Sequence, residues 1–254
     1  MRATARSSSL RISALIAASL AASASGGMPP PAATSTPQAV APDAARTARM
    51  QVHFAQAMVV HEAVIRGDLP AARERASWLA SQAAPGALPE GSAPYVSAMR
   101  DAAGRTAAAS SVLEAAMGTA AMLKTCGDCH RGVGTMPAAP LDAPGSAVRG
   151  VVGHMLAHQH AADQMLQGLV VPSSTLWRAG AAGLSTPPLA SADLPRDANL
   201  GPEAKASEGR IHVLAGQAGR VDEPGARAVF YAQILARCAD CHASHRKVWG
   251  PSRR

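Results

Sequence analysis

Apolar and polar residues follow a helical period along most of the chain. His53, Ala57, Val60 and Val64 fall on one face of a single predicted helix, because residues three or four positions apart lie on the same side. No segment of useful length alternates with the two-residue period of a β-strand. The pattern therefore predicts an all-α protein.

Breaks in this pattern predict eight helices, four in each half of the chain. Gly67 and Asp68 end the first helix, and Pro70 suits the first turn of the next, where its missing N–H costs little. The predicted helices span approximately residues 44–66, 70–83, 95–103, 106–131, 147–167, 173–183, 202–219 and 224–244.

The two halves also repeat one another in their landmark residues. His53 and His154 each precede a glycine by fourteen positions, and Trp78 has a counterpart in Trp177. Such spacing predicts a tandem repeat of about 110 residues. The predicted parts are a first four-helix bundle at 44–134, a linker at 135–145, a second bundle at 146–246 and a tail at 247–254.

The first 24 residues have the features of a cleaved secretory signal. Arg2, Arg6 and Arg11 form a basic start, and the apolar run at 12–22 is shorter than the ~20 residues that a membrane span needs. Residues 25–43 follow as a flexible leader rich in Pro, Ala, Ser and Thr. Cleavage would lower the net charge from +7 to +4, and no cluster of Lys and Arg favours nucleic acid. We therefore expect a periplasmic protein that binds no nucleic acid.

Composition excludes a disordered chain and poses a packing question. Hydrophobic residues make up 48% of the sequence and charged residues 16%, which is too apolar for disorder. Aromatic residues make up only 3%, so something other than rings must fill much of the interior.

Every cysteine of the chain lies in a Cys-x-x-Cys-His unit, at 126–130 and at 238–242. This is the attachment signature of c-type haem, in which two thiols bind the porphyrin and the His binds the iron. A thioredoxin-like site needs a βαβ context, whereas the sequence around both motifs is predicted to be helical. A Cys₄ zinc site usually has its two cysteine pairs about 15–20 residues apart, whereas these pairs are 112 residues apart. Disulfides would fit an oxidising compartment but give no reason for the two His residues. The predicted haem-binding residues are Cys126, Cys129, His130, Cys238, Cys241 and His242.

A helix bundle with Cys-x-x-Cys-His near the end of its fourth helix resembles the cytochrome c′ and cytochrome b562 class. The resemblance rests on the two motifs and on helix number and order, and it covers nearly all of the chain after residue 24 as two copies. It implies two tandem four-helix bundles, each burying one covalently attached haem between its helices. A porphyrin in each core would also account for the few aromatic side chains.

The sixth ligand of each iron separates electron transfer from gas binding. In an up-down-up-down bundle the end of the fourth helix lies beside the start of the first. This placement selects His53 opposite His130 and His154 opposite His242, and the repeat selects the same two residues. The cytochrome c′ pattern has a five-coordinate iron beneath an apolar residue, so these imidazoles put gas binding in doubt.

Other side chains near these positions leave alternatives open. His61 lies ~12 Å further along the first helix and is too far away to bind the same iron. His158 is the alternative to His154, since it lies on the same face one turn later, and Met50 and Met155 are thioether alternatives. His212 has no counterpart in the first half, and we expect it at the surface.

Two filled axial positions on each iron predict an electron carrier. Expected partners are periplasmic redox proteins or a membrane electron-transfer complex, with no small-molecule substrate and no catalytic residue. Three alternatives remain: a gas-binding or sensing haem protein, a dihaem peroxidase with one open haem, and a redox subunit of a larger complex. Arg105 and Arg220 recur after paired glycines and either pair with haem propionates or remain in solvent.

Overall fold

The computed structural model describes residues 44–82, 88–137, 150–186 and 202–249. Within these residues all regular secondary structure is helical, which confirms the all-α prediction. The helices are α1 (Ala44–Ile65), α2 (Leu69–Ser81), α3 (Ala93–Ala107), α4 (Val112–Gly132), α5 (Gly150–Val170), α6 (Ser174–Leu184), α7 (Pro202–Ala218) and α8 (Pro224–Trp249). The predicted signal, the leader and most of the linker lie outside the described residues.

Each half of the chain packs its helices in the same order. In the first half α1 contacts α2, α2 contacts α3, α3 contacts α4, and α4 returns to α1. In the second half α5, α6, α7 and α8 make the same sequence of contacts, and α8 returns to α5. This shared path agrees with an internal repeat.

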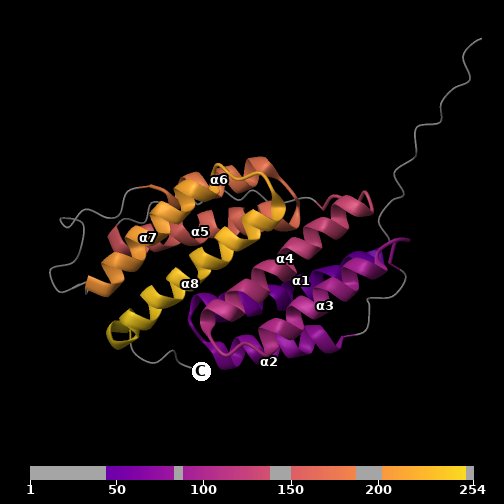
Figure 1. The fold of residues 1–254 in the computed structure, drawn as a ribbon, viewed down its shortest axis with the longest axis horizontal. Helices are drawn as coiled ribbons and strands as arrows, with labels where there is room; N and C mark the ends of the chain where they lie inside the picture. The colour runs from indigo at the N-terminus through magenta and orange to yellow at the C-terminus, as the bar shows by residue number, and fades with distance from the viewer. Residues whose placement is uncertain (1–43, 83–87, 138–149, 187–201, 250–254) are drawn as a thin grey trace, which may run out of the picture. The chain divides into compact units, whose positions relative to one another are not determined.

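The halves are also packed against one another. Helices α4 and α8, which carry the two Cys-x-x-Cys-His motifs, lie side by side (Figure 1), α4 also contacts α5, and α1 also contacts α8. The buried apolar residues form one cluster with members from all eight helices, many of them alanines that let the helices approach closely. None of the helices in the described ranges is long and apolar enough to cross a membrane. A division into two bundles with separate cores stays a prediction.

The boundary between α3 and α4 differs from the prediction. Helix α3 continues through Gly104 to Ala107, and α4 begins at Val112 rather than at Thr106. The Thr106 hydroxyl donates to the carbonyl of Ala102 within α3. The start of α4 is fixed by a cap, because the Ser111 hydroxyl accepts a hydrogen bond from the Glu114 backbone N–H.

A buried polar contact joins α1 to α8. His61 Nε2 lies 2.8 Å from the Tyr231 hydroxyl, which donates to the carbonyl of Ala162 on α5. Because that hydroxyl hydrogen is already used, the geometry assigns the imidazole proton to Nε2, where it is donated to the Tyr231 oxygen. Burial lowers the pKa of His61 to about 4, so the ring is neutral at pH 7. The contact thus ties the two halves together without a buried charge.

Candidate functional site

The first Cys-x-x-Cys-His motif occupies the last turns of α4. Cys126 and Cys129 are free thiols one helical turn apart. Burial raises the pKa of Cys126 to about 12, and Cys126 packs against the apolar core. Burial also raises the pKa of Cys129, although a hydrogen bond with the Ser92 side chain opposes this rise. Both thiols are therefore protonated at neutral pH.

The histidine of this motif is oriented by the second half of the chain. His130 Nδ1 lies 2.7 Å from the backbone carbonyl of Val170 at the end of α5. A neutral imidazole donating from Nδ1 to that oxygen presents its Nε2 lone pair, which is the arrangement found in many metal-binding histidines. Gly127, inside the motif, permits this approach, because a Cβ there would overlap the carbonyl of Leu169.

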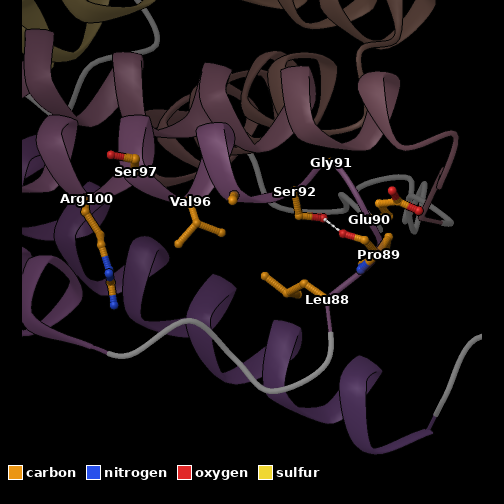
Figure 2. A pocket seen from close by; sticks show the side chains of 9 residues that line it. Leu88, Pro89, Glu90, Gly91, Ser92, Val96, Ser97 and Arg100 are labelled. Carbon is orange, nitrogen blue, oxygen red and sulfur yellow. Dashed lines mark hydrogen bonds between the residues drawn. The ribbon is translucent and has the colours of Figure 1, made fainter.

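A cavity of about 490 Å³ opens along the start of α3. It is lined by the start of α3 and the residues just before that helix, including Ser92, which interacts with Cys129. Figure 2 shows Leu88 and Val96 directed toward this space, with Arg100 at one end and Glu90 at the other. The volume falls within the range of cofactor pockets, about 300–1,000 Å³.

The predicted distal ligand His53 lies at the Arg100 end of this arrangement. Its pKa is lowered first by burial and then by the positive charge of Arg100. The imidazole is half-buried against Trp78, with ring centroids 5.9 Å apart. Arg100 donates to the carbonyl of Gln82, and its Nε is buried with no hydrogen-bond partner among the described residues. Two lining residues thus connect the cavity to the predicted site, because Ser92 interacts with Cys129 and the charge of Arg100 acts on His53. Ligation of the first iron by His53 stays a prediction.

The second motif lies in the corresponding part of α8. Cys238 and Cys241 are also free thiols, and burial raises the pKa of Cys238 to about 12. The pKa of Cys241 is raised by burial and then by the nearby charges of Glu208 and Asp240. His242 follows them and is half-buried. The influence of Glu208 shows that α7 comes close to this motif.

Three histidines gather around Glu208 between α5 and α7. The ring centroid of His158 lies 4.1 Å from that of His154 and 5.2 Å from that of His212. His154 Nε2 lies 2.8 Å from the Glu208 carboxylate, and His212 Nδ1 lies 2.7 Å from the carbonyl of Leu184. One nitrogen from each of the three rings lies within 4.8 Å of the other two, so the cluster could hold a metal ion.

The expectation that His212 is a surface residue is wrong. Its side chain is only 10% exposed, because α7 packs on α8 and its neighbour α6 supplies the Leu184 carbonyl. His212 has no counterpart in the first half, so the repeat could not indicate that it is buried. The cluster is recognised only from the residues of α5 and α6 that contact His212 in the folded protein. Burial lowers the pKa of His158 to about 3, with further contributions from His154 and His212, so His158 is neutral at pH 7.

Several other candidates from the sequence are exposed to solvent. Met50 and Met155 are exposed on α1 and α5. Arg105 and Arg220 are also exposed, and Arg220 donates to the carbonyl of Gly216 within its own half. Arg100, which the repeat does not single out, is the arginine that lines the cavity.

Comparison of the chain with models of known protein families, with curated proteins and with solved structures finds no significant match. The sequence motifs and the side-chain geometry therefore carry the functional argument alone.

Proposed function

We propose that the protein is a dihaem c-type cytochrome that carries electrons. The observation that carries this proposal is the pair of Cys-x-x-Cys-His motifs, each in the late turns of a long helix with both of its thiols free. Two thiols one turn apart can reach two substituents on one porphyrin, and the adjacent His can bind its iron. Each half of the chain would then hold one haem as a repeated unit.

In the first half, Cys126 and Cys129 would attach the haem and His130 would bind the iron. The hydrogen bond of His130 Nδ1 to the Val170 carbonyl supports this role, since it orients the ring and directs Nε2 to a ligand. The cavity beside Cys129 offers space for part of a porphyrin. His53 would be the distal ligand, and the guanidinium of Arg100 could pair with a propionate.

In the second half, Cys238 and Cys241 would attach the haem and His242 would bind the iron. His154 would be the distal ligand, with His158 as the alternative on the same face of α5. The closeness of Glu208 to both Cys241 and His154 supports this arrangement, because it brings the motif and the α5 imidazoles to the same region.

Haem supplies one-electron chemistry by cycling its iron between the ferric and ferrous states. His130 with His53, and His242 with His154, would hold the irons in both states, so that little bond rearrangement would accompany electron transfer. Hydrogen bonds such as that of His130 to the Val170 carbonyl, together with burial, would tune the reduction potential. Residues 1–24 would direct export to the periplasm, where redox proteins or a membrane electron-transfer complex would be the partners.

The test is to express the chain with c-type maturation and weigh the secreted protein. We expect the mass of two covalently bound haems, and a Cys126→Ala/Cys129→Ala variant should lose one of them. An apo mass under these conditions would overturn the proposal.

Carbon monoxide then separates a carrier from the alternatives with an open iron. Two six-coordinate haems should give sharp low-spin bands in the reduced state that CO leaves unchanged. A large CO-induced shift would favour a gas-binding or peroxidase-type protein over the electron carrier.

A further inference from the structure

The three imidazoles between α5 and α7 are arranged as a set of metal ligands in their own right. His154 and His158 lie one turn apart on α5, and His212 reaches them from α7, with its ring centroid 6.3 Å from that of His154. We propose that His154, His158 and His212 form a binding site for one divalent transition-metal ion of the imidazole-preferring class, with Zn²⁺ as its simplest member.

The spacing of the nitrogens is close to that of a coordinated set. The three candidate ligand atoms all lie within 4.8 Å of one another. Nitrogens bound to one tetrahedral Zn²⁺ at about 2.0–2.1 Å lie approximately 3.4 Å apart. Small side-chain rotations would therefore complete the site without movement of either helix.

Two of these nitrogens are buried without a hydrogen-bond partner among the described residues. These atoms are Nε2 of His158 and Nε2 of His212. His158 is 8% exposed and the His212 side chain is 10% exposed, so water has little access to either ring. A buried polar atom without a partner typically costs about 1–3 kcal/mol, and two such atoms in one cluster are an unusual cost. A bound cation would satisfy both.

The groups around the imidazoles are those that usually support metal-binding histidines. The carbonyl of Leu184 accepts from His212 Nδ1, which leaves the lone pair on Nε2. The Glu208 carboxylate lies 2.8 Å from His154 Nε2 and 3.8 Å from His212 Nε2. Glu208 is thus a positioning residue that holds His154 and places a negative charge beside the ion.

This inference does not depend on haem attachment, but it has a consequence for the proposed second haem. His154 and His158 can each bind only one metal at a time. An ion in the cluster would therefore compete with the second iron for its distal ligand, whereas His212 belongs to the cluster alone.

The test is a titration with Zn²⁺ of the full chain expressed without haem attachment, in which no second iron competes for His154 or His158, after chelator treatment and followed by calorimetry and metal analysis. We expect one Zn²⁺ per chain at this site, with His212→Ala weakening the binding at least 100-fold. Glu208→Gln should weaken it about 10- to 100-fold. His160→Ala, on α5 outside the cluster, is the matched control and should leave the affinity unchanged. Equal Zn²⁺ binding in wild type and His212→Ala would overturn the proposal.

Cobalt provides a second readout that does not rely on variants. Co²⁺ in the same haem-free wild-type chain should give the visible bands of a nitrogen-ligated tetrahedral site without sulfur charge transfer, which distinguishes the cluster from the cysteines. Sulfur charge transfer alone, or no visible bands, would refute the site even if His212→Ala failed to fold. Haem content, measured by mass, is independent of both metal titrations, so failure of the dihaem proposal would be recognised separately.

Discussion

The two candidate sites repeat the same attachment motif but differ in what faces it. In the first half a cavity of about 490 Å³ is lined by Ser92, which interacts with Cys129, and by Arg100, whose positive charge acts on His53. In the second half, Glu208 approaches Cys241 while contacting a cluster of three imidazoles. The two thiols and the following His are therefore the same in both halves, while the side chains around the proposed distal ligands differ.

This difference indicates where the functions of the two halves would separate. With His53 as its distal ligand the first site would have no replacement imidazole, whereas in the second site His158 could replace His154 or the three imidazoles could bind a second metal. Residues that the repeat shares, such as His53 and His154, reveal what the sites have in common. Residues that it does not share, such as His212 and Glu208, reveal how they differ.

The largest expected effect is the loss of a distal ligand. His53→Ala should convert one haem fully to a high-spin, CO-binding state, because no second imidazole replaces it. His154→Ala should convert the other haem only in part, since the His158 ring lies 4.1 Å away, and His154→Ala/His158→Ala should complete the change. Visible spectra of the reduced proteins with CO measure these changes. Complete conversion in both single variants would remove the proposed difference between the sites.

The buried His61–Tyr231 contact has no counterpart in the repeat and should make stability depend on pH. The pKa of His61 is about 4 when folded and about 6.5 when unfolded, so the unfolded state binds more protons between these values. The contribution of His61 to the free energy of unfolding should therefore be complete above pH 6.5 and fall by about 3 kcal/mol as the pH drops to 4.

Urea denaturation at several pH values measures this loss. His61→Gln keeps a donor for the Tyr231 oxygen but cannot titrate in this range, so the difference in slope between wild type and variant isolates His61. Parallel slopes for the two proteins would mean that His61 does not control the pH dependence.

The residue after the first cysteine of each motif differs between the halves, Gly127 in one and Ala239 in the other, and substitutions there should have smaller effects on stability. Gly127→Ala should lower the free energy of unfolding by about 2–3 kcal/mol, because the new Cβ overlaps the Leu169 carbonyl between α4 and α5. At the equivalent position Ala239 is buried, and Ala239→Gly should cost about 1–2 kcal/mol through lost burial and added chain entropy. Urea midpoints compare the two, and a neutral Gly127→Ala would contradict the tight α4–α5 contact.

The smallest expected effect concerns the aspartate that both motifs share. Asp128 pairs with Lys124 and Arg131, and its side chain is 26% exposed, while Asp240 pairs with Arg237 and is 51% exposed. Both Asp→Asn changes should cost less than about 1 kcal/mol, with Asp128→Asn the larger and both reduced by salt. Thermal unfolding at low and high salt checks this order, and a larger cost for Asp240→Asn would reverse it.

Helical periodicity, glycine and proline breaks and the paired motifs were enough to predict the helices and their order. They misplaced the α3–α4 boundary, because Gly104 is tolerated inside α3 while the Ser111 cap and Glu114 determine the start of α4. They missed the burial of His212, since this burial depends on contacts of the folded protein. The Leu184 carbonyl at the end of α6 accepts from the ring, and Glu208 lies beside it one turn earlier in α7. Local patterns carry information about faces and ends of helices, whereas such contacts depend on how the helices assemble.

The hydrogen bond of His130 to Val170 also bears on the order in which the protein can mature. The acceptor carbonyl lies 40 residues further along the chain than the imidazole that it orients. Under the proposed export from the N-terminus, the first motif would reach the attachment machinery before the residue that aligns its histidine has emerged. We expect haem attachment at the first motif to precede the final orientation of its ligand, so that early translocation intermediates would carry a bound but loosely ligated haem.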